Sequence, residues 1–411
     1  MRRIFHPRSC LRRIVLCIFL VLLFLLVPFA SPICVDIFWI QHSPSADPLF
    51  QADNGGDLVY INQSGKIVVH LDRPAFLGNL HGEFHDGLLL FWEGGRSRFL
   101  NERGKIVAFP NVDKMGEFSE GLAAGRDKAT QKWGFINTQG DFLIPPSYQE
   151  SEISEYNSFS DGMTVIRTSE RDGFKAGFLD RTGAVAIEAK LLESNPFHEG
   201  VARVIIEGPC KRGTRPCSSF PGIFVLPGFG TPTAATPFCK YAFIDKAGHP
   251  LFPQRFDDAK DFSEDLAPVK IDGKWGFIDK TGAIVIKPEF ESAESFSDGL
   301  ALVNQDGLSG FIAHDGTMAI APQFKHAEDF VDGLALVGTG WPGGDNKFWY
   351  IDHSGRQAIP DSFPLATSFF KGLAHVRFSE GNRGPQNMWM GKFGYIDRTG
   401  KSVFTYNFNR R

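Results

Sequence analysis

The chain has 411 residues and the composition of an ordinary folded protein, with 22% charged and 43% hydrophobic residues. Its formal net charge is −4, and the first 40 residues hold five Arg and one Asp, so residues 41–411 carry about −8. An acidic chain of this kind lacks the basic surface that phosphate backbones require, so we expect no nucleic-acid binding. Phe is frequent, with 40 copies against 7 Tyr and 7 Trp, and it recurs at fixed places, which indicates core positions.

Residues 1–40 differ from the rest of the chain and form a targeting segment. Their arginines precede an uncharged run from Ile14 to Ala30 that is rich in Leu, Val, Phe and Ile. A basic flank before a long apolar run keeps the N-terminus in the cytoplasm and sends the following chain across the membrane. The apolar character continues, broken by Asp36, to Ile40, which favours an uncleaved membrane anchor. A cleaved signal, which would leave a secreted or periplasmic protein, is the alternative.

The remaining chain is repetitive. The stretches that begin at Phe262 and Phe296 match at about half of their positions, and Phe330 opens the next copy, so the period is 34 residues. A fixed period in this range indicates a repeat architecture. A second landmark, an apolar pair followed four residues later by Gly, predicts nine units, which end at Gly65, Gly104, Gly140, Gly183, Gly248, Gly282, Gly316, Gly355 and Gly400.

Each unit is predicted to hold three short strands. The first leads into a turn such as Asp306-Gly307, a pair that favours the positive φ of tight hairpins. The return strand ends at a turn such as residues 279–282, where the Asp caps the turn and the Gly takes the left-handed conformation. The third strand, over 284–286, is expected to stop at Pro288, which cannot donate to a continuing ladder. Helical spacing is absent outside the N-terminus, so we expect little helix.

The return strands carry a resemblance. Residues 274–279 read Lys-Trp-Gly-Phe-Ile-Asp, and residues 132–137 read Lys-Trp-Gly-Phe-Ile-Asn. This motif resembles the signature of the WG-repeat (KWG-repeat) family, which is widespread in bacteria, and the resemblance extends from about residue 49 to the C-terminus. In other copies the Trp position holds Ala176, Ser309 or Phe393. The resemblance implies a non-catalytic interaction module, and therefore a binding or scaffolding role.

The sequence contains no pattern that indicates chemistry. A catalytic carboxylate needs a distinctive environment, so the acidic residues that recur at the return-strand turns are interpreted as turn formers: Asp180, Asp245, Asp279, Asp352 and Asp397. No calcium loop, zinc knuckle or catalytic signature appears. We therefore expect no metal, no cofactor and no enzymatic activity. Six histidines are interpreted as solvated groups at different repeat positions: His81, His85, His314, His326, His353 and His375.

Extra residues gather between the first strand and the return strand of five units, at 125–132, 168–176, 208–239, 338–347 and 379–392. Insertions at one repeat position map to one face, often the binding face, although tips in solvent also tolerate length. Aromatic residues together with Arg are typical of contact anchors. The candidate contact residues in these tips are Lys211, Arg212, Arg215, Phe220, Phe224, Phe229, Trp341 and Trp389.

The insertion at 208–239 holds six Pro, five Gly and three Cys, and we expect an irregular loop. Export is compatible with a disulfide. Cys210 and Cys217 could close a small ring. Pairing Cys210 with Cys239 would instead close the loop at its neck, where hairpin strands bring opposed residues close together, and closing a longer loop removes more unfolded-state entropy. We favour this second pairing.

The predicted fold of residues 49–411 is an all-β array of about nine three-stranded meanders, either open and curved or closed as a propeller-like toroid. The start near Leu49 and the stop near Thr405 fall at similar phases of the repeat, so no strand is left over to close a ring, which favours the open array. The predicted function is binding or scaffolding on the extracytoplasmic side of a bacterial membrane, with protein or cell-wall glycan as partner. The alternative is a hydrolase that acts from a central channel.

Overall fold

The structure is a computed structural model that describes residues 48–55, 57–74, 81–82, 84–93, 96–101, 105–170, 173–207, 240–340, 346–378 and 391–408. All of them belong to one compact unit, Asp47–Arg411. The predicted targeting segment and the insertion at 208–239 lie outside the described residues. Within the described ranges every regular element is a strand, and no helix is long and apolar enough to cross a membrane. The all-β prediction for the repeats is confirmed.

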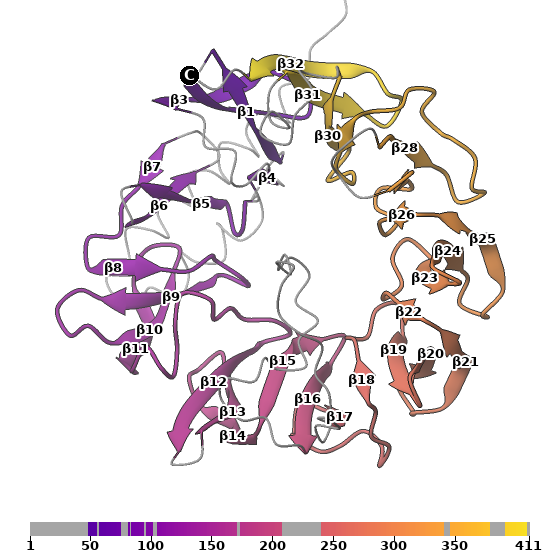
Figure 1. The fold of residues 1–411 in the computed structure, drawn as a ribbon. Coiled ribbons are helices and arrows are strands. Elements are labelled where there is room, and N and C mark those ends of the chain that lie inside the picture. Colours follow the sequence, from indigo (N-terminus) through magenta and orange to yellow (C-terminus); the bar gives the residue numbers. More distant parts are fainter. Residues whose placement is uncertain are drawn as a thin grey trace, which may run out of the picture. The chain divides into compact units, whose positions relative to one another are not determined.

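The strands form small antiparallel sheets that follow one another along the chain (Figure 1), and we number these sheets 1 to 9 in chain order. Sheet 1 has the order β3-β2-β1-β4 and contains β1 (Leu49–Asn54), β2 (Asp57–Ile61), β3 (Ile67–Pro74) and β4 (His81–Gly82). Sheet 2 contains β5 (Leu88–Glu93), β6 (Arg96–Asn101) and β7 (Ile106–Val107). Sheet 3 contains β8 (Val112–Met115), β9 (Leu122–Asp127), β10 (Trp133–Asn137) and β11 (Phe142–Tyr148).

The middle sheets follow the same plan. Sheet 4 contains β12 (Met163–Glu170), β13 (Gly173–Asp180) and β14 (Val185–Leu191). Sheet 5 contains β15 (Glu193–His198), β16 (Val201–Glu207) and β17 (Lys240–Ile244). Sheet 6 contains β18 (Asp258–Ala259), β19 (Leu266–Ile271), β20 (Lys274–Asp279) and β21 (Ile284–Phe290).

The last three sheets complete the series. Sheet 7 contains β22 (Ser292–Ala293), β23 (Ala301–Gln305), β24 (Leu308–Ile312) and β25 (Met318–Phe324). Sheet 8 contains β26 (His326–Ala327), β27 (Ala335–Gly338) and β28 (Phe348–Ile351). Sheet 9 contains β29 (Leu365–Ala366), β30 (Leu373–Arg377), β31 (Gly391–Asp397) and β32 (Ser402–Phe408).

The prediction of three strands per unit is wrong for part of the chain. Sheets 1, 3, 6, 7 and 9 have four strands in the described residues, because a short first strand precedes the F-x-x-G turn and pairs with the strand after it. In sheet 1 this edge position is taken by β4, which comes later in the chain. The first strand is only two residues long in sheets 6, 7 and 9, so no alternating pattern could reveal it.

The fourth strand also runs further than predicted, because β21 continues through Pro288 to Phe290. Trp275 pairs with Phe290 and Phe277 pairs with Ile286, so three residues of β21 face Gly276 alone. Pro288 lies in this bulge, on the outermost strand of its sheet, where its missing N–H breaks no ladder.

The bulge explains the glycine of the Trp-Gly motif. A Cβ atom on Gly276 would lie 2.5 Å from the carbonyl oxygen of Ile286 and 2.7 Å from the nitrogen of Pro288. In four other sheets the strand that follows the return strand crowds the equivalent glycine in the same way, at Gly134, Gly177, Gly310 and Gly394. The motif therefore needs glycine for space next to a bulged strand and not for an unusual φ.

Replacing Gly276 by alanine is expected to lower the free energy of unfolding by about 1–3 kcal/mol, because two backbones must move apart. Gly125, in β9, is the matched control, since its Cβ would lie 3.3 Å from a methyl group of Val112, a side chain that can move. Gly125→Ala is expected to change stability by less than about 0.5 kcal/mol. Chemical denaturation of both variants measures the difference, and equal losses would contradict the steric explanation.

The core lies between successive sheets and not within one sheet. Phe277 and Trp275 of sheet 6, for example, pack with Phe296 and Val303 of the sheet 7 repeat in one buried cluster. The Phe of the F-x-x-G turn is at most 3% exposed at Phe118, Phe159, Phe197, Phe262, Phe296, Phe330 and Phe369. Phe84 is only half-buried, so burial of this Phe in every unit is not observed.

Sheet 9 also packs against sheet 1, and β32 lies beside β1 (Figure 1). Phe50 of sheet 1 and Tyr395 of sheet 9 share a buried cluster, and the Tyr395 hydroxyl donates to the carbonyl of Gln51 at 2.7 Å. A Cβ on Gly65 would lie 2.3 Å from the carbonyl oxygen of Val403 and 2.9 Å from one of its methyl groups. Elsewhere the same turn glycine meets the preceding repeat, as Gly316 meets Ile286. Among the described strands none is shared between sheets 9 and 1.

Candidate binding surface

The connections within each sheet lie at the two opposite ends of the strands, because successive turns of an antiparallel meander alternate between those ends. The F-x-x-G turn and the Asp turn lie at one end, which we call the turn edge. The hairpin that leads into the return strand, such as the one between β19 and β20, lies at the other end, which we call the tip edge. An ion pair of 3.2 Å between Arg181 and Glu120 joins the two kinds of turn across neighbouring repeats.

The strands that flank the five predicted insertions pair as hairpins of the tip edge: β9 with β10, β12 with β13, β16 with β17, β27 with β28, and β30 with β31. In the β12–β13 hairpin the extra residues lengthen both strands, because pairing continues to Glu170 and Gly173. The candidate contact residues and the two cysteines lie outside the described residues: Lys211, Arg212, Arg215, Phe220, Phe224, Phe229, Trp341, Trp389, Cys210 and Cys239.

The compact tips have the predicted chemistry. Asp306 and Gly307 have φ values of 53° and 72°, and Asp272 and Gly273 have 50° and 83°. Positive φ at both central residues is the geometry of a two-residue hairpin turn.

At the turn edge, the recurring aspartates are engaged by their own turns. Oδ1 of Asp279 accepts hydrogen bonds from Thr281 N at 2.8 Å, Thr281 Oγ1 at 2.6 Å and Ala283 N at 3.0 Å. The Thr281 hydroxyl is the main reason that the pKa of Asp279 is lowered. Asp180, Asp352 and Asp397 make the same set of bonds. This geometry supports the interpretation of these residues as turn formers.

A second set of carboxylates links neighbouring repeats, and the sequence did not predict it. The residue before the glycine of F-x-x-G accepts a hydrogen bond from the equivalent turn of the next repeat; Asp298 Oδ2, for example, lies 2.7 Å from Gly333 N. The serine of the same turn also binds the next repeat, because Ser297 Oγ donates a hydrogen bond to the Phe330 carbonyl at 2.7 Å. The other acceptors are Asp86, Glu120, Asp161, Glu199, Glu264 and Asp332.

Removing one of these links is expected to destabilise the array measurably. Asp298 and Asp306 have almost equal positive φ values, 51° and 53°, so alanine costs the same backbone strain at both. Only Asp298 accepts a hydrogen bond from the next repeat, and at this exposed site we expect Asp298→Ala to cost about 1 kcal/mol more than Asp306→Ala. Chemical denaturation of the two variants tests this, and equal losses would show that the link contributes nothing.

The residue that follows the turn-aspartate position, which Ala313 fills in sheet 7, contacts the same links. The His314 ring stacks on Phe296 at 4.1 Å, and its Nε2 lies 3.1 Å from Glu264. The His353 ring stacks on Phe330 at 4.4 Å. These two histidines therefore occupy one repeat position, so the prediction of different positions is wrong for them, although the His314 side chain is 42% exposed and His353 is exposed. The prediction of solvated groups is wrong for two buried histidines, His326 and His375, which are 7% and 2% exposed.

Polar residues next to the short first strands join neighbouring repeats as well. Lys260 pairs with Glu294, and Arg203 binds Asp261 at 3.1 Å. Burial, with Glu294 and Glu328 nearby, raises the pKa of Asp329 to about 6. Asp329 and Asp261 both stand directly before the Phe of F-x-x-G, so this carboxylate occupies a repeat position and is not special to one unit. In the described part of the chain, no group of three His, Cys, Asp or Glu is placed to hold a metal ion.

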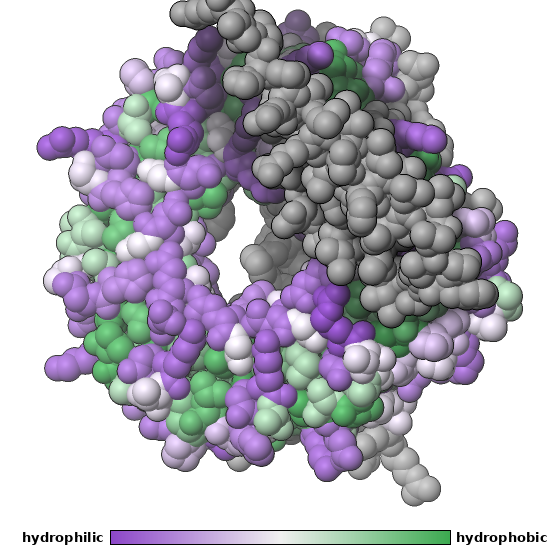
Figure 2. Space-filling view, turned by 180° about the vertical axis from the view of Figure 1, so that it is seen from behind, coloured by the Kyte–Doolittle hydropathy of each residue, from purple (hydrophilic) through white to green (hydrophobic). Residues whose placement is uncertain are grey.

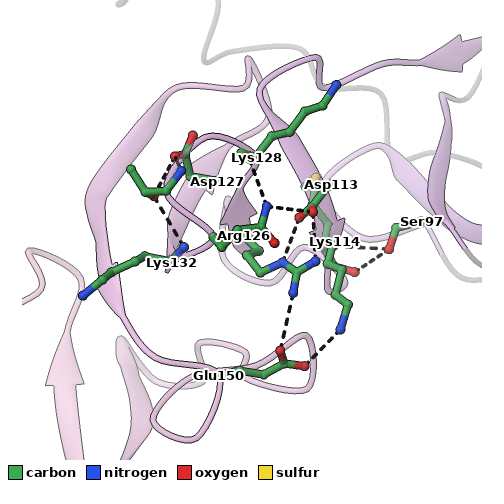
Figure 3. Close-up of polar contacts among 11 residues, drawn as sticks. Ser97, Asp113, Lys114, Arg126, Asp127, Lys128, Lys132 and Glu150 are labelled. Carbon is green, nitrogen blue, oxygen red and sulfur yellow. Dashed lines mark hydrogen bonds and ion pairs between the residues drawn. The ribbon is translucent and has the colours of Figure 1, made fainter.

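A cleft of about 620 Å³ opens between sheets 2 and 3, beside the tip of the β9–β10 hairpin. Figure 3 shows its polar wall, in which Arg126 lies between two carboxylates. Arg126 binds Asp113 through two nitrogens, at 2.9 and 2.8 Å, and Glu150 at 3.5 Å, and Lys114 reaches Glu150 at 3.0 Å. The hydrogen bond from Arg126 is the main reason that the pKa of Asp113 is lowered.

Exposed apolar side chains recur on the outermost strands, at Leu143, Val185 and Ile284, which are 53–58% exposed. Figure 2 shows hydrophilic residues interspersed with smaller hydrophobic patches over the visible described surface. Apolar groups scattered singly in this way are normal for a folded protein and indicate no contact site.

Six segments of the chain match the family described as WG containing repeat, at residues 98–124, 133–169, 177–208, 241–275, 275–308 and 310–340. The chain belongs to the WG-repeat family. Each matched segment begins in a return strand (β6, β10, β13, β17, β20 or β24) and ends in or beside the hairpin that holds the return strand of the next sheet. Each matched WG repeat therefore spans parts of two successive sheets and the buried core between them, and not one whole sheet.

Solved structures resemble this WG-repeat protein only distantly. Kluyveromyces lactis Hsv2p is 9% identical with a TM-score of 0.34, covering 65% of this chain and 91% of its own. The Pyrococcus horikoshii acylaminoacyl peptidase is 9% identical with a TM-score of 0.31, covering 76% and 52%. The tricorn protease is 11% identical with a TM-score of 0.25, covering 88% and 44%. No curated protein matches the chain.

Proposed function

We propose that this WG-repeat protein is a non-enzymatic binding or scaffold protein that contacts its partner, a protein or a cell-wall glycan, through the tip edge. One observation carries the proposal: length varies between repeats at the tip edge, from two-residue turns such as Asp306-Gly307 to the insertion at 208–239. At the turn edge, polar side chains are instead used to hold neighbouring repeats together. Variable loops on a regular scaffold are where binding residues are usually found.

We propose further that the nine sheets close into a ring. The buried cluster of Phe50 and Tyr395 joins sheet 9 to sheet 1 in the way that the other clusters join successive sheets. Gly65 meets the last strand of sheet 9 as Gly316 meets that of sheet 6, although at Val403, one residue before the position that corresponds to Ile286. In a ring, the tips of all repeats would surround one face.

The location rests on the N-terminal segment. We propose that the basic flank and the apolar run from Ile14 to Ala30 hold the repeats outside the cytoplasm of a bacterial cell and keep them attached to the membrane. Fractionation of the full chain after a carbonate wash tests this. Recovery in the soluble fraction with a new N-terminus near residue 31 would contradict the anchor, and recovery from the cytoplasm would contradict export.

The partner surface is tested by photo-crosslinking at two exposed positions of one repeat. A photoreactive residue at Ala129 lies at the tip edge, and one at Gln139 lies at the turn edge of the same sheet. We expect covalent adducts, with a protein or with purified cell walls, to form from position 129 and not from position 139. Equal adducts at both positions would contradict a partner surface at the tips.

A second test shortens the largest tip. Residues 209–238 are replaced by Asp-Gly, the turn of the compact repeats, and cell-wall pelleting and adduct formation are measured again. We expect loss of partner binding without loss of the fold, as judged by circular dichroism. Unchanged binding would remove the long tip from the contact surface.

The hydrolase alternative requires a carboxylate or histidine special to one repeat and placed at a pocket. Asp329 has a raised pKa, but it shares its repeat position with Asp261, which is bound by Arg203. A recurring position is better explained by a structural role, so this observation favours binding over hydrolysis.

A further inference from the structure

We propose that the cleft between sheets 2 and 3 is a binding site for a small organic anion, one that carries a carboxylate or a phosphate group. The site goes beyond the partner surface proposed above, because its ligand is a small molecule, although Arg126, Lys128 and Gln131 of the lining belong to the tip at 125–132. It rests on three observations: a local departure from the repeat, the charge of the lining, and the fixed geometry of one wall.

The departure from the repeat creates the space. Phe99 and Leu100 occupy the places of Phe277 and Ile278, so Ser97-Arg98 stands where other repeats have Trp-Gly. The fourth strand of this sheet, β7, is only two residues long, against seven in β21. In sheet 6 the bulged fourth strand leaves no room for a side chain at Gly276. In sheet 2 the corresponding strand ends at Val107, and Arg98 lines the cleft that remains.

The charge of the cleft selects the ligand. Four of the lining residues are cationic, namely Arg98, Lys114, Arg126 and Lys128, and one, Asp113, is a carboxylate. Asp113 is already held by both Arg126 and Gln131, so little of its acceptor capacity is left for a ligand. Glu150, outside the lining, also pairs with Arg126 and Lys114, so four cations face two carboxylates, which is still a local excess of positive charge in a chain whose net charge is −4. Charge-assisted hydrogen bonds to carboxylate or phosphate oxygens are the interactions that such a lining offers.

The geometry suits a small molecule. Small-molecule sites usually enclose roughly 300–1,000 Å³ and combine an apolar lining with a few fixed polar groups, and this cleft measures about 620 Å³. Its apolar lining includes Phe99 and Met115, which are 1% and 3% exposed. The side chain of Arg126 is 17% exposed and is fixed by its two bonds to Asp113. The Ser97 hydroxyl holds the two sheets together by donating to the Met115 carbonyl at 2.9 Å.

The test is isothermal titration of the full chain with three sugars of similar size: glucuronate, glucose 6-phosphate and glucose. We expect the two anions to bind and neutral glucose not to bind at millimolar concentration. The two anions distinguish a carboxylate site from a phosphate site. Raising the ionic strength to about 1 M, where the Debye length is about 3 Å, is expected to weaken binding.

Two variants locate the site. Lys128→Ala and Arg98→Ala are each expected to weaken anion binding about tenfold, which is the usual consequence of losing one charge-assisted bond. Lys190→Ala is the matched control, because the Lys190 side chain is 79% exposed and lies on β14, outside the lining. Circular dichroism and thermal unfolding confirm that each variant is folded.

Three results would overturn the proposal: binding of glucose as strong as that of the anions, no binding of either anion, or equal effects of Lys128→Ala and Lys190→Ala. The probes are small and Arg98 lies on β6, outside the tip insertions, so the titrations of the unchanged chain and of Arg98→Ala bear on the cleft alone, whereas Lys128 also belongs to the tip at 125–132. The partner surface at the tips would stand or fall by its own crosslinking experiment.

Discussion

Replacing Phe296 by alanine is expected to lower the free energy of unfolding by about 3–5 kcal/mol, the usual cost of removing a buried aromatic ring. Phe296 is 1% exposed, its ring packs on Phe277 at 5.1 Å, and His314 stacks on it at 4.1 Å. The substitution therefore leaves a cavity in the core that joins sheet 6 to the following repeat. Chemical denaturation measures the loss.

Tyr156 is the control for Phe296, because it is 87% exposed. Tyr156→Ala is expected to change stability by less than about 0.5 kcal/mol. A small effect of Phe296→Ala would mean that the array opens locally at this repeat, since a repeat protein can lose one interface without unfolding throughout. Hydrogen exchange would then show lost protection in β20 and β23 only.

Phe50→Ala is expected to have an effect of the same size, about 3–5 kcal/mol, although Phe50 lies in the first strand of the array. Its ring is fully buried against two residues of sheet 9, Tyr395 at 5.4 Å and Phe370 at 6.2 Å. In a ring the first repeat is as well packed as any other, so the loss should match that of Phe296. In an open array Phe50 would be a surface group at one end, and its removal would cost little.

Val68→Ala is the matched control for the first sheet, since Val68 lies on β3 and is 38% exposed. A fall in stability for Phe50→Ala and not for Val68→Ala would support the ring. Equal and small effects for the two variants would contradict it, and would favour the open array predicted from the phases of the two chain ends.

Features that depend on neighbouring residues in the chain were predictable. The Asp306-Gly307 hairpin and the capped turn at Asp279 follow from side chains and φ preferences within five residues. The 34-residue period placed the five insertions at one hairpin of the repeat, and the strands that flank all five pair as that hairpin. Prediction failed for the short first strands and for β21 beyond Pro288, because a two-residue strand has no period and a bulge depends on the strand beside it.

Identifying the cleft requires both the sequence and the structure. The substitution of Trp-Gly by Ser97-Arg98 is visible in the sequence as a departure from the motif. That it opens a space follows only from the short β7 and from the position of the next sheet, which brings Asp113 and Arg126 to the opposite wall. From the sequence alone, charged residues of this kind are interpreted as solvated surface groups, because the sequence does not reveal which of them face one another.

The sequence by itself determined the repeat, the two strands of its central hairpin and its turn chemistry, because these depend on contacts within a few residues. The tertiary structure decided what each repeated side chain does to its neighbour. Asp298 and Gly333 are 35 residues apart and Tyr395 and Gln51 are 344 apart, yet both pairs form hydrogen bonds of 2.7 Å. Such pairs depend on how one sheet is placed against the next, and that placement follows from the packing of entire buried faces and not from any local pattern.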